Sequence, residues 1–272
     1  MDLKIISGLP ISIDENAMLV FSHTVGIKRV SHRTSSEMGD YLSSPNSRVT
    51  AGDLIYTVYH ETSLMSDESA IVSASLRYDI TTIYGGEFIF PSGEKEYYKT
   101  AGHYHPPFSG IELPEIYELL AGSGQWVIQR YRDEPSRIEE AYLIEASPGD
   151  KICIPPGFGH ATVNIGKEPL VIANATAKDL GYDYKPFQEL KGACYRILAS
   201  NRYNMVEIER NTNYELVPDL VKLKPKKDWF KGCNDPLYVT LSKTPEALDF
   251  LSHPEQTRKD FFSIGRLYQI TR

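Results

Sequence analysis

Cysteine is scarce in this chain. Its 272 residues include three cysteines, Cys153, Cys194 and Cys233, and no two of them are close enough to form a C-x-x-C motif. The scarcity argues against a disulfide framework and against a zinc ribbon, and it favours a reducing compartment such as the cytoplasm.

Long hydrophobic runs are also missing. No stretch approaches the ~18 consecutive apolar residues of a membrane helix. The first residues, MDLKIISGLPISIDEN, lack the basic start and the apolar run of a secretory signal. We therefore expect a soluble, cytoplasmic protein with no membrane partner.

Positive charge is in short supply. The chain has 29 lysine and arginine residues against 36 aspartate and glutamate residues, which gives a formal net charge of −7. Nucleic-acid phosphates would repel such a surface, so we expect no nucleic-acid partner. A phosphorylated small molecule is not excluded, because a local pocket of backbone N–H groups, hydroxyls and a metal binds phosphate whatever the global charge.

Short runs rich in Ile, Val, Tyr, Thr and Trp fill the middle of the chain. Turns containing Gly or Pro separate them, and no repeat of fixed period is visible. This sequence pattern predicts an all-β barrel or sandwich and not alternating β/α units. The runs are DLIYTVYH, ASLRYDITTIY, EFIF, EYYKT, GQWVIQRY, EEAYLIEA, DKICIPP, HATVNIG and PLVIANA.

We predict one domain over residues 1–272. Residues 1–48 form an N-terminal arm, in which the polar segment 31–48 is a loop or a loosely attached helix. Residues 49–200 form the barrel, and 201–272 form an extension packed on it. Within the extension we expect short helices at 244–249, where Thr244 is the cap, and at 254–262.

Three histidines and a glutamate follow one another in a suggestive order. His103 and His105 are two residues apart, as are Glu115 and Tyr117, so in strands each pair shares a face. His160 follows a Pro-Pro turn. An H-x-H pair by itself arises by chance, but three imidazoles and a carboxylate suit a divalent metal such as Fe²⁺, Ni²⁺, Mn²⁺ or Zn²⁺.

The remaining histidines have no partner at such a spacing. We interpret them as surface or loop residues. They are His23, His32, His60 and His253.

Several segments together resemble the cupin superfamily, and more closely the cupin-type glucose-6-phosphate isomerases. They are KTAGHYH (99–105), LPEIYELLAGSG (113–124), SPGD (147–150), PPGFGHATVNIGKEPL (155–170) and DLGYDY (179–184). The resemblance covers about residues 53–200. It implies a jelly-roll β-barrel and a homodimer that interconverts glucose 6-phosphate and fructose 6-phosphate in glycolysis and gluconeogenesis.

The resemblance also implies roles for individual residues. One divalent ion per subunit, Fe²⁺ before Ni²⁺, Mn²⁺ or Zn²⁺, is bound by His103, His105, Glu115 and His160. Glu115 and Tyr117 are the candidate catalytic residues. The candidate residues for binding a phosphorylated hexose are Tyr56, Thr82, Thr100, Gly102 and Tyr184. Tyr182 departs from the family pattern, in which this position is often His.

Two points stay open. Threonine hydroxyls and a glycine N–H can hold a phosphate, but Tyr and Thr are also common in strands for their β-propensity alone. Glu115 is asked to be both ligand and base, and coordination lowers basicity. The alternative functions are a cupin dioxygenase, which predicts oxygen consumption and a mostly apolar pocket, and a non-enzymatic sugar-binding cupin.

Overall fold

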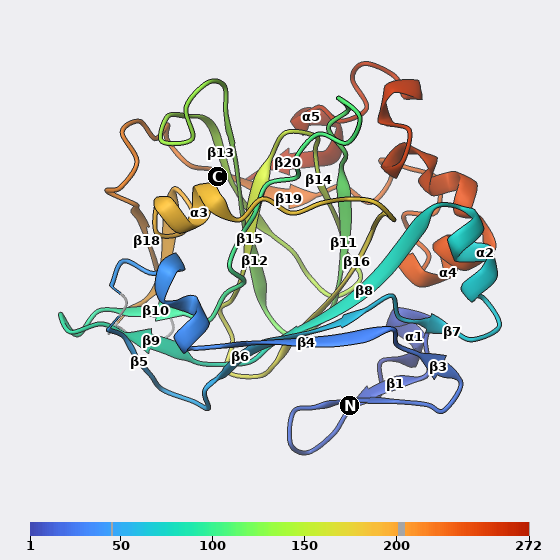
Figure 1. Ribbon diagram of the computed structural model, residues 1–272, viewed down its shortest axis with the longest axis horizontal. Coiled ribbons are helices and arrows are strands. Elements are labelled where there is room, and N and C mark those ends of the chain that lie inside the picture. Colours follow the sequence, from blue (N-terminus) through green and yellow to red (C-terminus); the bar gives the residue numbers. More distant parts are fainter. Residues whose placement is uncertain (45, 201–204, 272) are drawn as a thin grey trace.

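Two large β-sheets face each other in the computed structural model, which describes residues 1–44, 46–200 and 205–271 (Figure 1). In spatial order, the first sheet contains β14 (Lys151–Ile154), β11 (Glu115–Ala121), β16 (Leu170–Ala177), β8 (Leu76–Ile83), β6 (Leu54–His60) and β4 (Arg29–Thr34). The second contains β15 (Gly159–Asn164), β12 (Gly124–Tyr131), β13 (Ile138–Glu145), β19 (Val221–Pro225) and β20 (Tyr268–Ile270).

The predicted all-β architecture is confirmed. Strands β11, β15 and β16 are buried along their whole length. Buried polar side chains interrupt their apolar residues, among them Glu115 and Glu118 of β11 and His160 of β15.

A smaller sheet lies at one end of the barrel. In spatial order it contains β18 (Val206–Arg210), β17 (Tyr195–Ala199), β10 (Lys95–Tyr97), β9 (Glu87–Ile89) and β5 (Arg48–Val49). At the other end lie short elements of the arm, together with β7 and α2. They are α1 (Lys4–Ser7), β1 (Ile11–Ile13), β2 (Leu19–Phe21), β3 (Val25–Gly26), β7 (Ser63–Leu64) and α2 (Glu68–Ser73).

The N-terminal arm supplies a strand to the barrel. β4 pairs antiparallel with β6 and forms the edge of the first sheet. The prediction of a loop or loose helix from residue 31 is therefore wrong for Ser31–Thr34. An edge strand with mostly exposed or half-buried side chains needs no hydrophobic alternation, so the pattern was not visible. A 3₁₀ helix, η1 (Ser36–Tyr41), follows and buries Met38.

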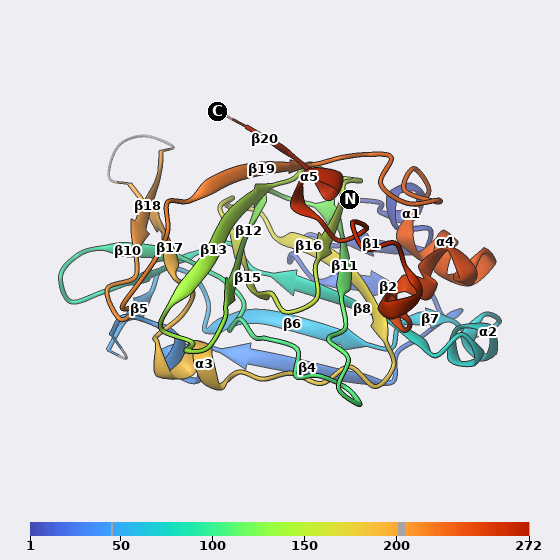
Figure 2. The ribbon, with the colours of Figure 1, turned by 90° about the horizontal axis from the view of Figure 1, so that it is seen from above.

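The C-terminal extension supplies two more strands. β19 pairs in parallel with β13, and β20 pairs antiparallel with β19. Figure 2 shows both strands on the side of the molecule opposite β4 and β6. Residues 201–204 of the predicted extension, and its last residue, 272, lie outside the described residues.

The helices of the extension differ from those predicted. The extension contains α4 (Leu237–Lys243), η2 (Pro245–Leu251), η3 (Pro254–Gln256) and α5 (Ile264–Leu267), and α3 (Lys185–Glu189) precedes it. The helix predicted at 244–249 is the 3₁₀ helix η2. Thr244 makes no side-chain cap bond there, and its hydroxyl donates to the Thr240 carbonyl at 3.3 Å. The helix predicted at 254–262 is wrong beyond Gln256.

A buried ion pair fastens the extension to the barrel. Lys151 Nζ lies 2.7 Å from Glu118 Oε1, and the backbone N–H of Leu237 donates to Glu118 Oε2 at 2.8 Å. The last bond satisfies an N–H at the start of α4 that has no partner within the helix. None of the described helices has both the length and the apolar character that a bilayer crossing requires.

Candidate metal centre

The four predicted ligand residues converge at one point inside the barrel. Glu115 Oε2 lies 3.2 Å from His105 Nε2, 3.3 Å from His160 Nε2 and 4.0 Å from His103 Nε2. His103 precedes β11 in an extended segment, which pairs with β15 through two bonds between the backbones of His103 and His160, of 3.1 and 3.0 Å. All four donor atoms lie within 4.8 Å of one another.

Three of the four donor atoms that face this point have no hydrogen-bond partner among the described residues, and the fourth, His160 Nε2, lies 2.9 Å from the Tyr117 hydroxyl. His103 Nε2, His105 Nε2 and Glu115 Oε2 are buried without a hydrogen bond. Buried polar atoms are rarely left so. The opposite atoms are held, since Asn174 Nδ2 donates to Glu115 Oε1 at 2.8 Å and His105 Nδ1 lies 3.1 Å from the Leu113 carbonyl. The set therefore fits a divalent cation, with supporting bonds that orient its ligands.

The protonation states suit a metal ion as well. Burial lowers the pKa of His103 well below its ordinary value, and the neighbouring His160 and His105 lower it further. Burial also lowers the pKa of His160. For Glu115, burial opposes ionisation, but its close contacts with His105 and His160 outweigh burial and leave the pKa well below its ordinary value. Neutral imidazoles and an ionised carboxylate are the forms that bind a metal.

A cavity of about 80 Å³ is lined by two of the four ligand residues, His103 and Glu115. Five of the residues predicted from the sequence line it beside the metal donors, and they are Tyr56, Thr100, Gly102, Tyr117 and Tyr184. The Tyr117 hydroxyl lies 2.9 Å from His160 Nε2, and burial raises the Tyr117 pKa well above its ordinary value. Tyr117 therefore holds its proton at neutral pH, next to the metal donors.

Thr82 does not reach this cavity. Successive side chains of a strand point to opposite faces, and in β8 it is Thr81 that lines the cavity. Thr82 is the register partner of Thr57 on β6 and faces the other way. From the sequence, either threonine of the pair Thr81-Thr82 could line the cavity. Only the pairing of β8 with β6 decides which of the two does so.

Besides Thr81, three polar cavity residues were missed in the sequence. His60, which we interpreted as a surface residue, lines the cavity with its Nδ1 3.5 Å from Asp79 Oδ2. Asp79 and Asn174 are the other two. A signal for His60 was present, since it lies on the same face of β6 as Tyr56, four residues away.

Tyr182 closes one side of the centre. Its ring packs edge-on against the His103 ring, with centroids 4.6 Å apart and planes at 84°. Its hydroxyl accepts a hydrogen bond from Arg77 Nη2, and the guanidinium also lies 5.2 Å from the ring centre. The departure from the family pattern thus places a neutral phenol against the first metal donor.

Comparison with known proteins identifies the family of this chain. Residues 42–215 match the family model for glucose-6-phosphate isomerase (GPI). The chain belongs to this family. Among its glucose-6-phosphate isomerase relatives, that of Thermococcus litoralis is 30% identical over 142 residues, which cover 52% of this chain and 64% of the relative, just under two thirds. That of Pyrococcus abyssi is 29% identical over 167 residues, covering 60% and 78%.

Similarity to solved structures is weaker. Oxalate decarboxylase from Bacillus subtilis has a TM-score of 0.32 at 21% identity, covering 46% of this chain and 26% of that one. A recombinant oxalate oxidase in complex with glycolate has a TM-score of 0.33 at 14% identity, covering 47% and 54%.

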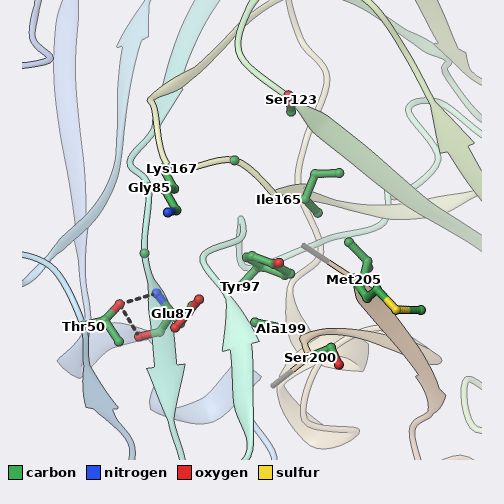
Figure 3. Close-up of a pocket in the computed structure, with 13 residues that line it drawn as sticks. Thr50, Gly85, Glu87, Tyr97, Ser123, Ile165, Lys167, Ala199, Ser200 and Met205 are labelled. Atoms are coloured by element: carbon green, nitrogen blue, oxygen red, sulfur yellow. Dashed lines mark hydrogen bonds between the residues drawn. The ribbon is translucent and has the colours of Figure 1, made fainter. Parts of the chain in front are cut away.

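A more spacious cavity of this glucose-6-phosphate isomerase family member lies elsewhere (Figure 3). It measures about 780 Å³ between loops near β9 and β10, where Thr50 Oγ1 accepts a bond from the Glu87 backbone N–H at 2.7 Å. Its lining includes Tyr97, Ile165 and Met205 but no histidine or cysteine. Because the metal donors converge on the small cavity, we place the chemistry there.

Proposed function

We propose that this chain is a metal-dependent isomerase that interconverts glucose 6-phosphate and fructose 6-phosphate in glycolysis and gluconeogenesis. The observation that carries the proposal is the convergence of four buried metal donors on a polar cavity within the residues that match the family. The relatives bear the name of this activity.

We propose Fe²⁺ as the ion, with Ni²⁺, Mn²⁺ and Zn²⁺ as alternatives, because imidazole and carboxylate ligands suit all four and availability selects among them. The ligands are His103, His105, Glu115 and His160. A divalent ion at this position supplies Lewis-acid stabilisation of the oxyanion that develops on the sugar.

The cavity walls bind and orient the sugar. Thr100 Oγ1 accepts a hydrogen bond from the Thr162 backbone N–H at 3.0 Å, which leaves its own proton free to donate to a ligand oxygen. Gly102 presents bare backbone beside it, and its φ of +77° places it in the left-handed region. Tyr56 and Tyr184 add two further tyrosines to the lining. Thr81 takes the cavity position that we predicted for Thr82.

The two candidate catalytic residues, Glu115 and Tyr117, have different roles. Both oxygens of Glu115 are engaged, one by Asn174 and one by the histidines, and its low pKa makes it a weak base while it remains there. The geometry favours its role as a ligand. Tyr117 keeps its proton and lies beside the metal donors, so it is placed to hold or donate a proton at a sugar oxygen.

A coupled assay tests the proposal. We expect the metal-reconstituted protein to convert fructose 6-phosphate to glucose 6-phosphate, and EDTA to remove the activity. Absence of turnover with each of the four metals would refute the isomerase function. An oxygen electrode run in parallel tests the dioxygenase alternative, whose expected apolar pocket does not match walls that contain Asp79, Thr81 and Asn174.

The route of hydrogen transfer needs a separate experiment. A base that removes the C2 proton passes through an enediol and exchanges that proton with solvent, whereas a direct hydride shift does not. Turnover in D₂O followed by NMR of the product distinguishes them. Extensive deuterium at the transferred position excludes a direct hydride shift.

We also propose a cytoplasmic homodimer. β4 and β18 form open edges of their sheets, and Val30 of β4 is 43% exposed. Pairing between copies covers such strand surface. Light scattering coupled to size-exclusion chromatography measures the mass, and a mass of one chain at micromolar concentration would contradict the dimer.

A further inference from the structure

The described residues that line the cavity include no lysine or arginine. A sugar phosphate carries up to two negative charges, and the carboxylates of Glu115 and Asp79 face the same space. Arg77 is committed elsewhere, since its Nε donates to Thr176 Oγ1 at 2.9 Å, its Nη2 bonds the Tyr182 hydroxyl, and it lies 3.9 Å from Asp79 Oδ2. Neutral hydroxyls alone would have to hold the phosphate against two carboxylates.

Arg33 lies next to two residues of the cavity wall, Tyr56 and Tyr184. It is half-buried on β4, in register with Tyr56 of β6 and therefore on the same face as that tyrosine. Its Nε donates to the Tyr56 hydroxyl at 3.3 Å, and its guanidinium carbon lies 6.0 Å from the Tyr184 ring centre. Both tyrosines line the cavity.

The guanidinium of Arg33 is largely uncommitted. Within the described parts of the chain it has this one hydrogen bond and no ion pair within 4.0 Å. Its acidic neighbour Glu37 instead accepts bonds from the backbone N–H and hydroxyl of Thr34, at 2.8 and 3.0 Å. The two terminal nitrogens therefore keep N–H groups in the fork that matches a phosphate.

The distance to the metal centre suits a hexose phosphate. The Tyr184 ring centre lies 6.0 Å from the Arg33 guanidinium carbon and 5.5 Å from the His103 ring centre, so Arg33 is at most about 11.5 Å from His103. With bonds of about 1.5 Å, an extended six-carbon sugar places its carbonyl end and its phosphate on the order of 8 Å apart. One molecule can therefore reach both.

We propose that Arg33 is the cationic part of the phosphate site, and that its guanidinium binds the phosphate of the sugar beside the metal cavity. The inference rests on the proposed function. It assigns a binding residue to the N-terminal arm, which lies outside residues 42–215 that match the family. The neutral donors Thr100 and Gly102 then orient the same substrate from the inner wall.

Arg33→Met tests the proposal, since it removes the charge and keeps most of the aliphatic stem. We expect KM for fructose 6-phosphate to rise roughly 10- to 100-fold, the loss of one charge-assisted contact, while kcat changes less than about threefold. The inhibition constant of inorganic phosphate should rise in parallel. Arg33→Lys should recover part of the loss. The control is Arg29→Met, which removes the same charge from an exposed position of β4.

The outcomes separate this inference from the proposed function. If the wild type turns over and Arg33→Met keeps the wild-type KM and phosphate inhibition, Arg33 binds no phosphate and the isomerase stands. If KM rises but phosphate inhibition is unchanged, Arg33 only positions Tyr56 and Tyr184, and the proposal is overturned. If the wild type does not convert fructose 6-phosphate, calorimetric titration with this compound shows whether it binds. Binding that Arg33→Met abolishes supports the phosphate site, and no binding to the wild type overturns both proposals.

Discussion

Glu115 is the residue on which the centre is built. One of its oxygens accepts from Asn174, and the other faces three imidazoles without a hydrogen bond. A buried carboxylate in that position is costly unless a cation or proton shares it. The side chain thus combines a firm anchor with an unsatisfied atom, which is the arrangement expected of a metal ligand held by its surroundings.

The first prediction concerns His160. Its replacement by alanine removes one of four donors and the partner of the Tyr117 hydroxyl. We expect His160→Ala to lose bound metal and isomerase activity together, measured by elemental analysis and the coupled assay. His23→Ala alters an exposed histidine and should keep both. Full metal occupancy in His160→Ala would contradict the assigned ligand set.

The second prediction concerns Gly102. A Cβ at this position would lie 2.5 Å from the Phe187 ring of α3, in a backbone with φ of +77°. We expect Gly102→Ala to lower the free energy of unfolding by roughly 2 to 4 kcal/mol through strain and overpacking. The control is Gly93→Ala, which has a φ of +86° and open space around the added Cβ. Equal losses in urea denaturation would show that the contact with Phe187 costs nothing.

At the scale of elements, the barrel and the extension meet at Glu118 of β11. Lys151 of β14 and the start of α4 share its carboxylate, and all of these groups are buried. Burial raises the pKa of Glu118 to about 7, although Lys151 opposes the shift. The ordinary value in an unfolded chain is about 4.3.

The third prediction follows from this shift. Between about pH 4.3 and pH 7 the folded state binds more protons at Glu118 than the unfolded state does. The contribution of Glu118 to the free energy of unfolding should therefore fall as pH rises through that range. Urea denaturation of the wild type and of Glu118→Gln from pH 4.5 to pH 7.5 measures it. The difference between wild type and variant should shrink with rising pH, and a growing difference would contradict the raised pKa.

At the scale of the whole molecule, the metal centre joins separate parts of the chain. Its ligands come from the extended segment before β11, from the start of β11 and from β15, so the centre spans both large sheets. An ion that binds only this assembled arrangement stabilises the folded state through mass action.

The fourth prediction is the effect of metal removal on melting. At a free concentration of 100 times Kd, a bound ion adds about 2.7 kcal/mol, on the order of 5–10 °C in Tm for a chain of this size. Dialysis against EDTA should lower Tm by this order, and adding back the metal should restore it. In His160→Ala the melting temperature should not respond to metal, and a full response there would place the stabilising ion elsewhere.

The sequence by itself determined the β-rich core and the four residues of the candidate metal centre. The β-type runs are long enough to identify their strands, and the ligands lie in short segments whose spacing of two residues fixes a common side, as at His103 and His105. Elements at the ends were less predictable. β4 has no hydrophobic alternation because it is an edge strand, and η2 and η3 are short 3₁₀ turns that resemble helix starts.

Only the tertiary structure decided which polar residues share the cavity. The register of β8 against β6 selects Thr81 over Thr82, and the same pairing brings His60 to Asp79. The pairing of β4 with β6 brings Arg33 beside Tyr56. These contacts join residues far apart in the chain. A shift of one residue in register would turn each strand's side chains to the opposite face, and local sequence does not fix that register.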